Sequence, residues 1–171
     1  YTEDIYVGYR YFETIAGAKE KVNYPFGFGL SYTEFRMEIA ECNFEEKETV
    51  VFVKVTNIGE RAGKEVVQLY SQAPGKILDG PARKLITYEK TRLLRPGELQ
   101  IVTLSFAKND LASYDDLGKI AKSAYILEQG TYAFYIGTSV RSAKKAAFTL
   151  EIGEHTVTLQ LASHLAPTSL A

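Results

Sequence analysis

After the first fifth of the chain, hydrophobic and polar residues alternate with a period of two, as in a β-strand that buries one face. In the run 49–57, for example, Val51, Val53 and Val55 share one face and Lys54 lies on the other. The alternating runs predict strands at 35–44, 49–57, 65–72, 84–94, 99–107, 123–127, 130–138 and 145–152. One-sided strands of this kind are typical of antiparallel sheets that have one packed face and one solvated face.

The same periodicity predicts which side chains face the core. They are Val102, Leu104, Phe106, Tyr132, Phe134, Ile136, Ala146, Phe148, Leu150 and Ile152. A last run, 155–161, places Val157, Leu159 and Leu161 on one face.

Short connections separate the runs, as in Arg-Pro-Gly-Glu at 95–98, and the only helix-like piece among the strands is a single turn at 109–112. Asn109 or Asp110 could cap this turn. Long helical crossovers are absent, so the pattern predicts an all-β fold: an antiparallel β-sandwich of the immunoglobulin or fibronectin type III kind, with seven or eight strands.

The first 33 residues do not follow the strand pattern. The chain has 12 Tyr, 9 Phe and no Trp, and ten of these 21 aromatic residues lie in the first 35 positions. We therefore predict an irregular, aromatic-rich extension at 1–33, a sandwich domain at 34–152, and a final strand with a linker at 153–171. The start at Tyr1, without an initiator Met or a signal sequence, indicates a piece of a larger protein.

Composition narrows the function classes. The 171 residues are 46% hydrophobic, which is enough for a packed core, and 20 basic residues balance 21 acidic ones. This balance disfavours nucleic acid as a partner, and no apolar run is long enough to span a membrane. Cys42 is the only cysteine, so no internal disulfide can form, and we interpret it as a small buried residue. The cellular compartment stays open.

Catalytic chemistry finds little support in these residues. The two histidines, His155 and His164, are too few and too far from the cysteine for a zinc site. The acidic pairs 45–46 and 115–116 fall in turns, where adjacent carboxylates are usually solvated. The glycines of 24–30 lack the strand and helix that a phosphate loop needs. We predict no catalytic residue, metal or cofactor within this chain.

Several motifs together point to a family. The segments at 1–12 (YTEDIYVGYRYF) and 24–35 (YPFGFGLSYTEF) closely resemble a signature of glycoside hydrolase family 3, the β-glucosidase and β-xylosidase family. The similarity continues through 55–59, 61–70, 94–98 and 110–115, in the order that the family has. It covers roughly residues 1–150.

The resemblance implies a larger enzyme. Such enzymes join a (β/α)8-type barrel, an α/β-sandwich domain and a fibronectin type III-like domain, so residues 1–33 are similar to the end of the α/β-sandwich domain and the bridge that leaves it. The family's nucleophile is a barrel Asp and its acid/base is commonly a Glu of the α/β-sandwich domain, and no residue here matches either motif. The parent is then a retaining enzyme acting on β-glucosides or β-xylosides. The chain past residue 152 is similar to members in which this domain precedes the barrel.

The resemblance also suggests partners, namely the barrel and α/β-sandwich domains of the same enzyme. Candidate contacts with them are Tyr9, Tyr11, Phe12, Phe26 and Phe28 in the extension, and Lys76, Asp79 and Arg83 in the long loop 73–83. Glycines 8, 27 and 29 are expected to provide positive φ or close backbone approach. In isolation, the extension should expose an apolar patch and be mobile or self-associating.

A different class of function is a carbohydrate-binding or adhesive β-sandwich module. Sugar platforms use flat, exposed aromatic side chains, and the absence of Trp removes the best of them. Most tyrosines in the strands also belong to the alternating pattern of the inward residues. This position favours packing in the core over binding of a sugar. We therefore expect a structural domain that braces the catalytic domains.

Overall fold

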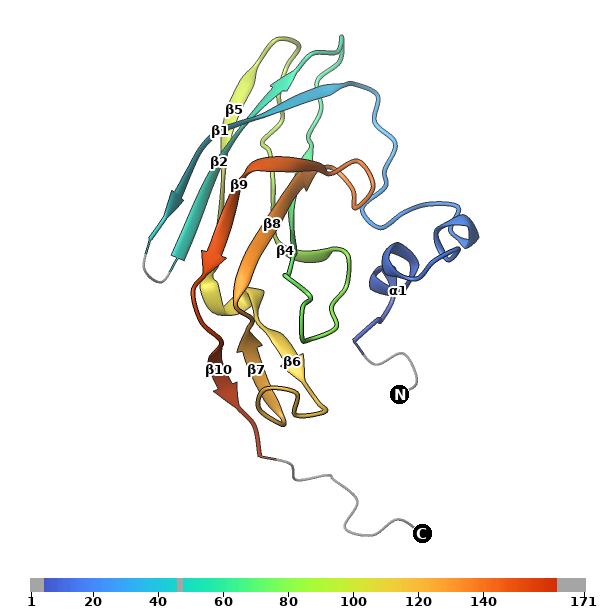
Figure 1. Cartoon of the computed structure of the whole chain (residues 1–171). Coiled ribbons are helices and arrows are strands. Elements are labelled where there is room, and N and C mark those ends of the chain that lie inside the picture. The colour runs from blue at the N-terminus through green and yellow to red at the C-terminus, as the bar shows by residue number, and fades with distance from the viewer. Residues whose placement is uncertain (1–4, 46–47, 163–171) are drawn as a thin grey trace.

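Two antiparallel sheets face each other in the computed structural model, which describes residues 5–45 and 48–162 (Figure 1). The first sheet has the order β1 (Phe35–Phe44), β2 (Glu48–Asn57), β5 (Leu99–Ala107). The second has the order β4 (Lys84–Lys90), β3 (Val66–Gln72), β8 (Gly130–Gly137), β9 (Lys144–Ile152). The predicted all-β sandwich is confirmed, and most strand ends lie within one residue of their predicted positions.

The core between the sheets is built from the predicted faces. Val51, Val53 and Val55 of β2 are 0% exposed, and Phe134 of β8 tilts against Phe106 of β5 with ring centroids 5.5 Å apart. The other predicted inward residues are buried or pack at the margin of this core. Burial of each large apolar side chain contributes roughly 1.5–3 kcal/mol, so the alternation that predicts the strands also supplies the stabilising surface.

A third, smaller sheet extends from one end of the sandwich. It has the order β10 (Thr156–Gln160), β7 (Ala124–Leu127), β6 (Ser113–Asp115). The sequence pattern misses β6, because three residues are too few to show a period. A bulge in β10 pairs Val157 with Ile126 but Leu159 with Tyr125. Since neighbouring residues of β7 face opposite sides, the prediction that Val157, Leu159 and Leu161 share one face is wrong.

Two connections depart from or refine the prediction. Strand β4 stops at Lys90 rather than at Leu94, which instead forms an isolated bridge with Gly63. The predicted single turn is present as the 3-10 helix η2 (Lys108–Leu111), in which the Asp110 carboxylate accepts a hydrogen bond from the backbone N–H of Ala107 at 2.9 Å.

The extension is more regular than predicted, because it contains the short helices α1 (Tyr9–Thr14) and η1 (Lys19–Lys21). Helix α1 lies beside the loop that joins β3 to β4 (Figure 1), where the backbone N–H of Ala82 donates to Thr14 Oγ1 at 2.9 Å. In the part of the chain that the structure describes, no helix is both long and apolar enough to cross a membrane.

Candidate interdomain surface

The extension covers part of the outer face of the second sheet, over β3. In β3, Val67 and Leu69 belong to the core, yet Tyr70 on the opposite face is also 0% exposed. The Tyr9 ring meets the Tyr70 ring edge-on at 6.3 Å and stacks on Phe26 at 4.4 Å. Burial, together with the neighbouring Tyr9 and Glu13, raises the pKa of Tyr70 well above its ordinary value.

A glycine turn of the extension rests directly on Gln68 of β3. Gly27 has φ +82°, and a Cβ at this position would lie 2.6 Å from both Nε2 and Oε1 of Gln68. Gln68 cannot easily move away, since its Nε2 donates to the Thr138 carbonyl at 2.6 Å and its Oε1 accepts from the Tyr70 hydroxyl. Gly8 also has a positive φ as expected, whereas Gly29 has neither a positive φ nor a close neighbour.

An ion pair that the sequence did not predict joins α1 to the loop between β8 and β9. The Glu13 side chain is only 5% exposed and accepts a hydrogen bond from Arg141 Nε at 2.8 Å, with Lys19 Nζ 3.6 Å away. The Arg141 guanidinium also donates to the Lys19 carbonyl at 3.0 Å. Two residues 128 positions apart give no local signal, so only the fold reveals this pair.

Asn57 forms the joint between the extension and the sandwich. Its Oδ1 accepts hydrogen bonds from Thr33 Oγ1 at 2.7 Å and from the Gly59 N–H at 3.1 Å. Its Nδ2 donates to the carbonyls of Arg61 and Leu94, at 2.7 and 2.9 Å. These bonds satisfy all the donor and acceptor atoms of the buried amide, which is a condition for a stable buried polar group.

The extension contacts the sandwich at several points. Stacking, the buried ion pair and the Asn57 joint connect residues 5–33 to it. The expected apolar exposure is nevertheless present. Tyr24, Leu30 and Tyr32 are 72%, 93% and 93% exposed, and Phe26 and Phe28 are nearly half exposed. The rings of Tyr24 and Phe28 lie 5.2 Å apart. We call the exposed side chains of Tyr24, Phe28, Leu30 and Tyr32 the aromatic surface.

The candidate contact residues therefore occupy different places. Tyr9 and Phe26 lie at the seam with the sandwich, while Phe28 belongs to the aromatic surface. Tyr11 is 39% exposed and packs edge-on against Phe12, with ring centroids 5.4 Å apart.

Loop 73–83 is fixed to the sandwich by its own contacts. Glu128 Oε1 accepts the backbone N–H groups of Lys76 and Ile77, at 2.8 and 2.7 Å. Asp79 pairs with Lys119 at 2.9 Å, and the Arg83 guanidinium lies 3.2 Å from the centroid of the Tyr135 ring. The side chains of Asp79 and Arg83 thus have separate partners, and Lys76 is held through its backbone N–H.

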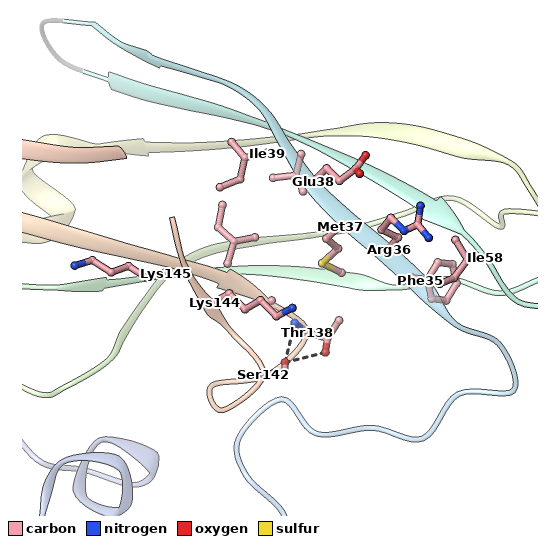
Figure 2. Close-up of a pocket in the computed structure, with 13 residues that line it drawn as sticks. Phe35, Arg36, Met37, Glu38, Ile39, Ile58, Thr138, Ser142, Lys144 and Lys145 are labelled. Carbon is pink, nitrogen blue, oxygen red and sulfur yellow. Dashed lines mark hydrogen bonds between the residues drawn. The ribbon is translucent and has the colours of Figure 1, made fainter. Parts of the chain in front are cut away.

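A groove of about 420 Å³ opens between the two sheets, where β1 and β9 are the edge strands (Figure 2). Strand β1 supplies Phe35, Met37 and Ile39, and β9 supplies Lys144 and Lys145. Phe35 is the single aromatic side chain among the residues that line it. This lining offers no aromatic platform for a sugar ring.

The remaining reactive groups have structural roles. Burial would raise the pKa of Asp115, which is 1% exposed, but hydrogen bonds from four backbone N–H groups outweigh it and lower this pKa. The donors belong to residues 118–121, at 2.7–2.9 Å. Burial raises the pKa of the Cys42 thiol to about 11, so the thiol is protonated at neutral pH. Among the described residues, no group of three His, Cys, Asp or Glu side chains could hold a metal ion.

Comparisons with known proteins agree with this architecture. Residues 65–140 match the model of the fibronectin type III-like domain. The chain is 51% identical to β-glucosidase A of Butyrivibrio fibrisolvens and 48% identical to a β-glucosidase of Ruminococcus albus. These alignments cover 99% and 98% of the chain but only 22% and 17% of the two proteins, so the chain spans about a fifth of their length.

Solved structures show the same likeness. A β-glucosidase from Paenibacillus barengoltzii superimposes with a TM-score of 0.91 at 44% identity, over 99% of this chain and 19% of that one. For β-glucosidase 3B of Thermotoga neapolitana, crystallised with α-D-glucose, the TM-score is 0.79 at 39% identity, over 91% and 20% of the two chains.

The fold and the comparisons together define the class of this domain. It is a fibronectin type III-like β-sandwich with an extension packed on its outer face. More specifically, the domain match and the β-glucosidase relatives together support a fibronectin type III-like domain of glycoside hydrolase family 3.

Proposed function

We propose that the parent protein is a retaining β-glucosidase that hydrolyses terminal, non-reducing β-D-glucosyl residues, and that this domain braces its catalytic domains. The nucleophile and the acid/base are contributed by those other domains. The support for this proposal comes from the similar β-glucosidases. They match nearly the whole of this chain, and the chain covers about a fifth of their length. A β-xyloside substrate is the second possibility within the same family.

The observation that carries the brace is the two-sided packing of the extension. One side is anchored on the sandwich through Tyr9 and Glu13, while the aromatic surface faces solvent. Exposed apolar patches of this kind mark interaction sites. In the intact enzyme, residues 1–33 end the preceding α/β-sandwich domain, and the aromatic surface packs against that domain or the barrel. Tyr11, Phe12, Lys76 and Asp79 are further candidate contacts with the neighbouring domains.

The test is to replace Tyr24 and Phe28 together by Ser in the intact enzyme. Each ring buries on the order of 100 Å² in such a contact, which corresponds to about 2.5 kcal/mol at 25 cal/mol per Å². We expect a lower Tm and a lower kcat/KM for a β-glucoside, while the same double variant of the 171-residue chain keeps its Tm. Tyr88→Ser in β4 is the matched control, because Tyr88 is 63% exposed. An intact enzyme unchanged by the double substitution contradicts the brace.

A sugar-binding module remains distinguishable by experiment. Calorimetric titration of the chain with cello-oligosaccharides should give no binding heat. Clear saturable binding would favour the module over the brace.

A further inference from the structure

A second, polar pocket of about 260 Å³ lies at the seam between the extension and the sandwich. It is lined by Glu13 and Lys19 of the extension, Arg83 of loop 73–83, and Val140 and Arg141 of the loop between β8 and β9. Three cations face one carboxylate, so the lining carries a net formal charge of +2.

The one carboxylate of the pocket is already engaged. Glu13 is bonded to Arg141 at 2.8 Å and has Lys19 3.6 Å away. Arg83 has no carboxylate within 4.0 Å among the residues that the structure describes, and its Nη1 donates only to the carbonyl of Ala82, at 2.7 Å. A guanidinium has five N–H donors in a planar fork, so most of the donors of Arg83 have no partner within residues 5–45 and 48–162.

Arg83 is also held in a fixed orientation. Its guanidinium lies over the Tyr135 ring at 3.2 Å, and the Tyr135 hydroxyl in turn donates to Gln72 Oε1 at 2.9 Å. Stacking covers a face of the guanidinium and leaves the N–H groups at its edge, which are the groups that bind a carboxylate in bidentate fashion. A preorganised, unpaired guanidinium in a pocket of positive charge is suited to a planar anion.

We infer that this pocket binds the carboxylate of an Asp or Glu side chain from a neighbouring domain of the same enzyme, with Arg83 as the main ligand and Arg141 beside it. The inference rests on the proposed brace, because the pocket is formed by the extension that carries the aromatic surface. It adds the chemistry of the partner: an acidic side chain close to apolar residues.

The first test uses the 171-residue chain with acetate as the probe. The NMR signals of the arginine Nε–Hε groups are followed while sodium acetate replaces sodium chloride at constant ionic strength. We expect a saturable shift at Arg83 and Arg141, which Arg83→Met abolishes and Arg83→Lys weakens. Arg61 is exposed and serves as the reference, and Arg61→Met should leave the shift at Arg83 intact. A shift at Arg83 no larger than at Arg61 overturns the site.

The second test identifies the source of the carboxylate. Phenylglyoxal labels accessible arginines, and mass spectrometry gives the rate for each residue. We expect acetate to slow labelling of Arg83 in the chain, and labelling of Arg83 to be at least about tenfold slower in the intact enzyme. Arg61 should react at similar rates in both. Equal rates for Arg83 in chain and enzyme overturn the assignment to a neighbouring domain. The Tyr24 and Phe28 experiment tests the brace separately, so the two failures can be told apart.

Discussion

Replacement of Asn57 by Ala should destabilise the chain more than any surface substitution. The side chain is 0% exposed and makes four hydrogen bonds at 2.7–3.1 Å. At about 1 kcal/mol for each of the four bonds, the expected loss is about 4 kcal/mol. For a domain of this size, that loss corresponds to a Tm lower by roughly 10 °C.

Asn57→Asp gives a sharper version of the same test. The substitution keeps the acceptor for Thr33 but places a carboxylate oxygen against the carbonyls of Arg61 and Leu94. At neutral pH this variant should be less stable than Asn57→Ala, since it buries an unpaired charge. Burial raises the pKa of the introduced carboxyl above its unfolded value, so its destabilising effect should shrink as the pH falls and the group becomes protonated.

Urea unfolding followed by circular dichroism measures both variants against the wild type, at pH 7 and pH 5. Asn109→Ala is the control, because Asn109 is exposed and should change the free energy of unfolding by less than about 0.5 kcal/mol. An Asn57→Ala variant within that margin of the wild type, with an unchanged m-value, would refute the assignment of Asn57 as the joint.

Three further substitutions, and a fourth as a control, test other contacts. Arg141→Ala leaves the buried carboxylate of Glu13 without its best partner. The free energy of unfolding should fall by about 2–3 kcal/mol, and the extension should become open to limited proteolysis. An unchanged cleavage pattern would argue against a role of this ion pair in holding the extension. The lowered pKa of Asp115 contributes stability that is full above the ordinary Asp pKa near 4 and is lost as the pH falls through the lower folded value. Asp115→Asn should therefore lower the Tm at pH 7 and flatten its acid dependence, and parallel Tm–pH curves would contradict this. Gly27→Ala forces a Cβ to 2.6 Å from a fixed side chain at φ +82°, and should cost about 2 kcal/mol or more in urea unfolding. Gly29→Ala, in open space, should cost less than about 1 kcal/mol, and equal losses would exclude the close contact.

The sandwich was predictable because each long strand buries one face and shows it in the sequence. Val51, Val53 and Val55 are the clearest case, since they alternate and are all fully buried. The third sheet was not predictable in the same way. Strand β6 is three residues long, and the bulge in β10 breaks the register that a strict period of two assumes.

The contact between the extension and the sandwich was harder to predict. Its partners are distant in sequence, and its apolar residues resemble ordinary core residues. Gln68 lies in an otherwise apolar run, and this buried polar residue was the available hint that β3 is covered on both faces. Nothing local connects Glu13 to Arg141. The exposure of the aromatic surface was predictable only in outline, from the concentration of Tyr and Phe, since the sequence could not show that Tyr9 turns inward and Tyr24 outward.

The division predicted at residue 33 does not mark a break in the described structure. The carbonyl of Glu34 accepts the N–H of Ile58 at 2.8 Å, next to the bond from Thr33 to Asn57. Without residues 5–33, the face of β3 that holds Tyr70 would lose its cover and Glu13 would no longer pair with Arg141. The extension therefore serves as an outer layer of this sandwich, and in the proposed brace the same residues transmit the position of the sandwich to a neighbouring domain. A brace requires this rigidity, because a flexible link could hold two domains near each other without fixing their orientation.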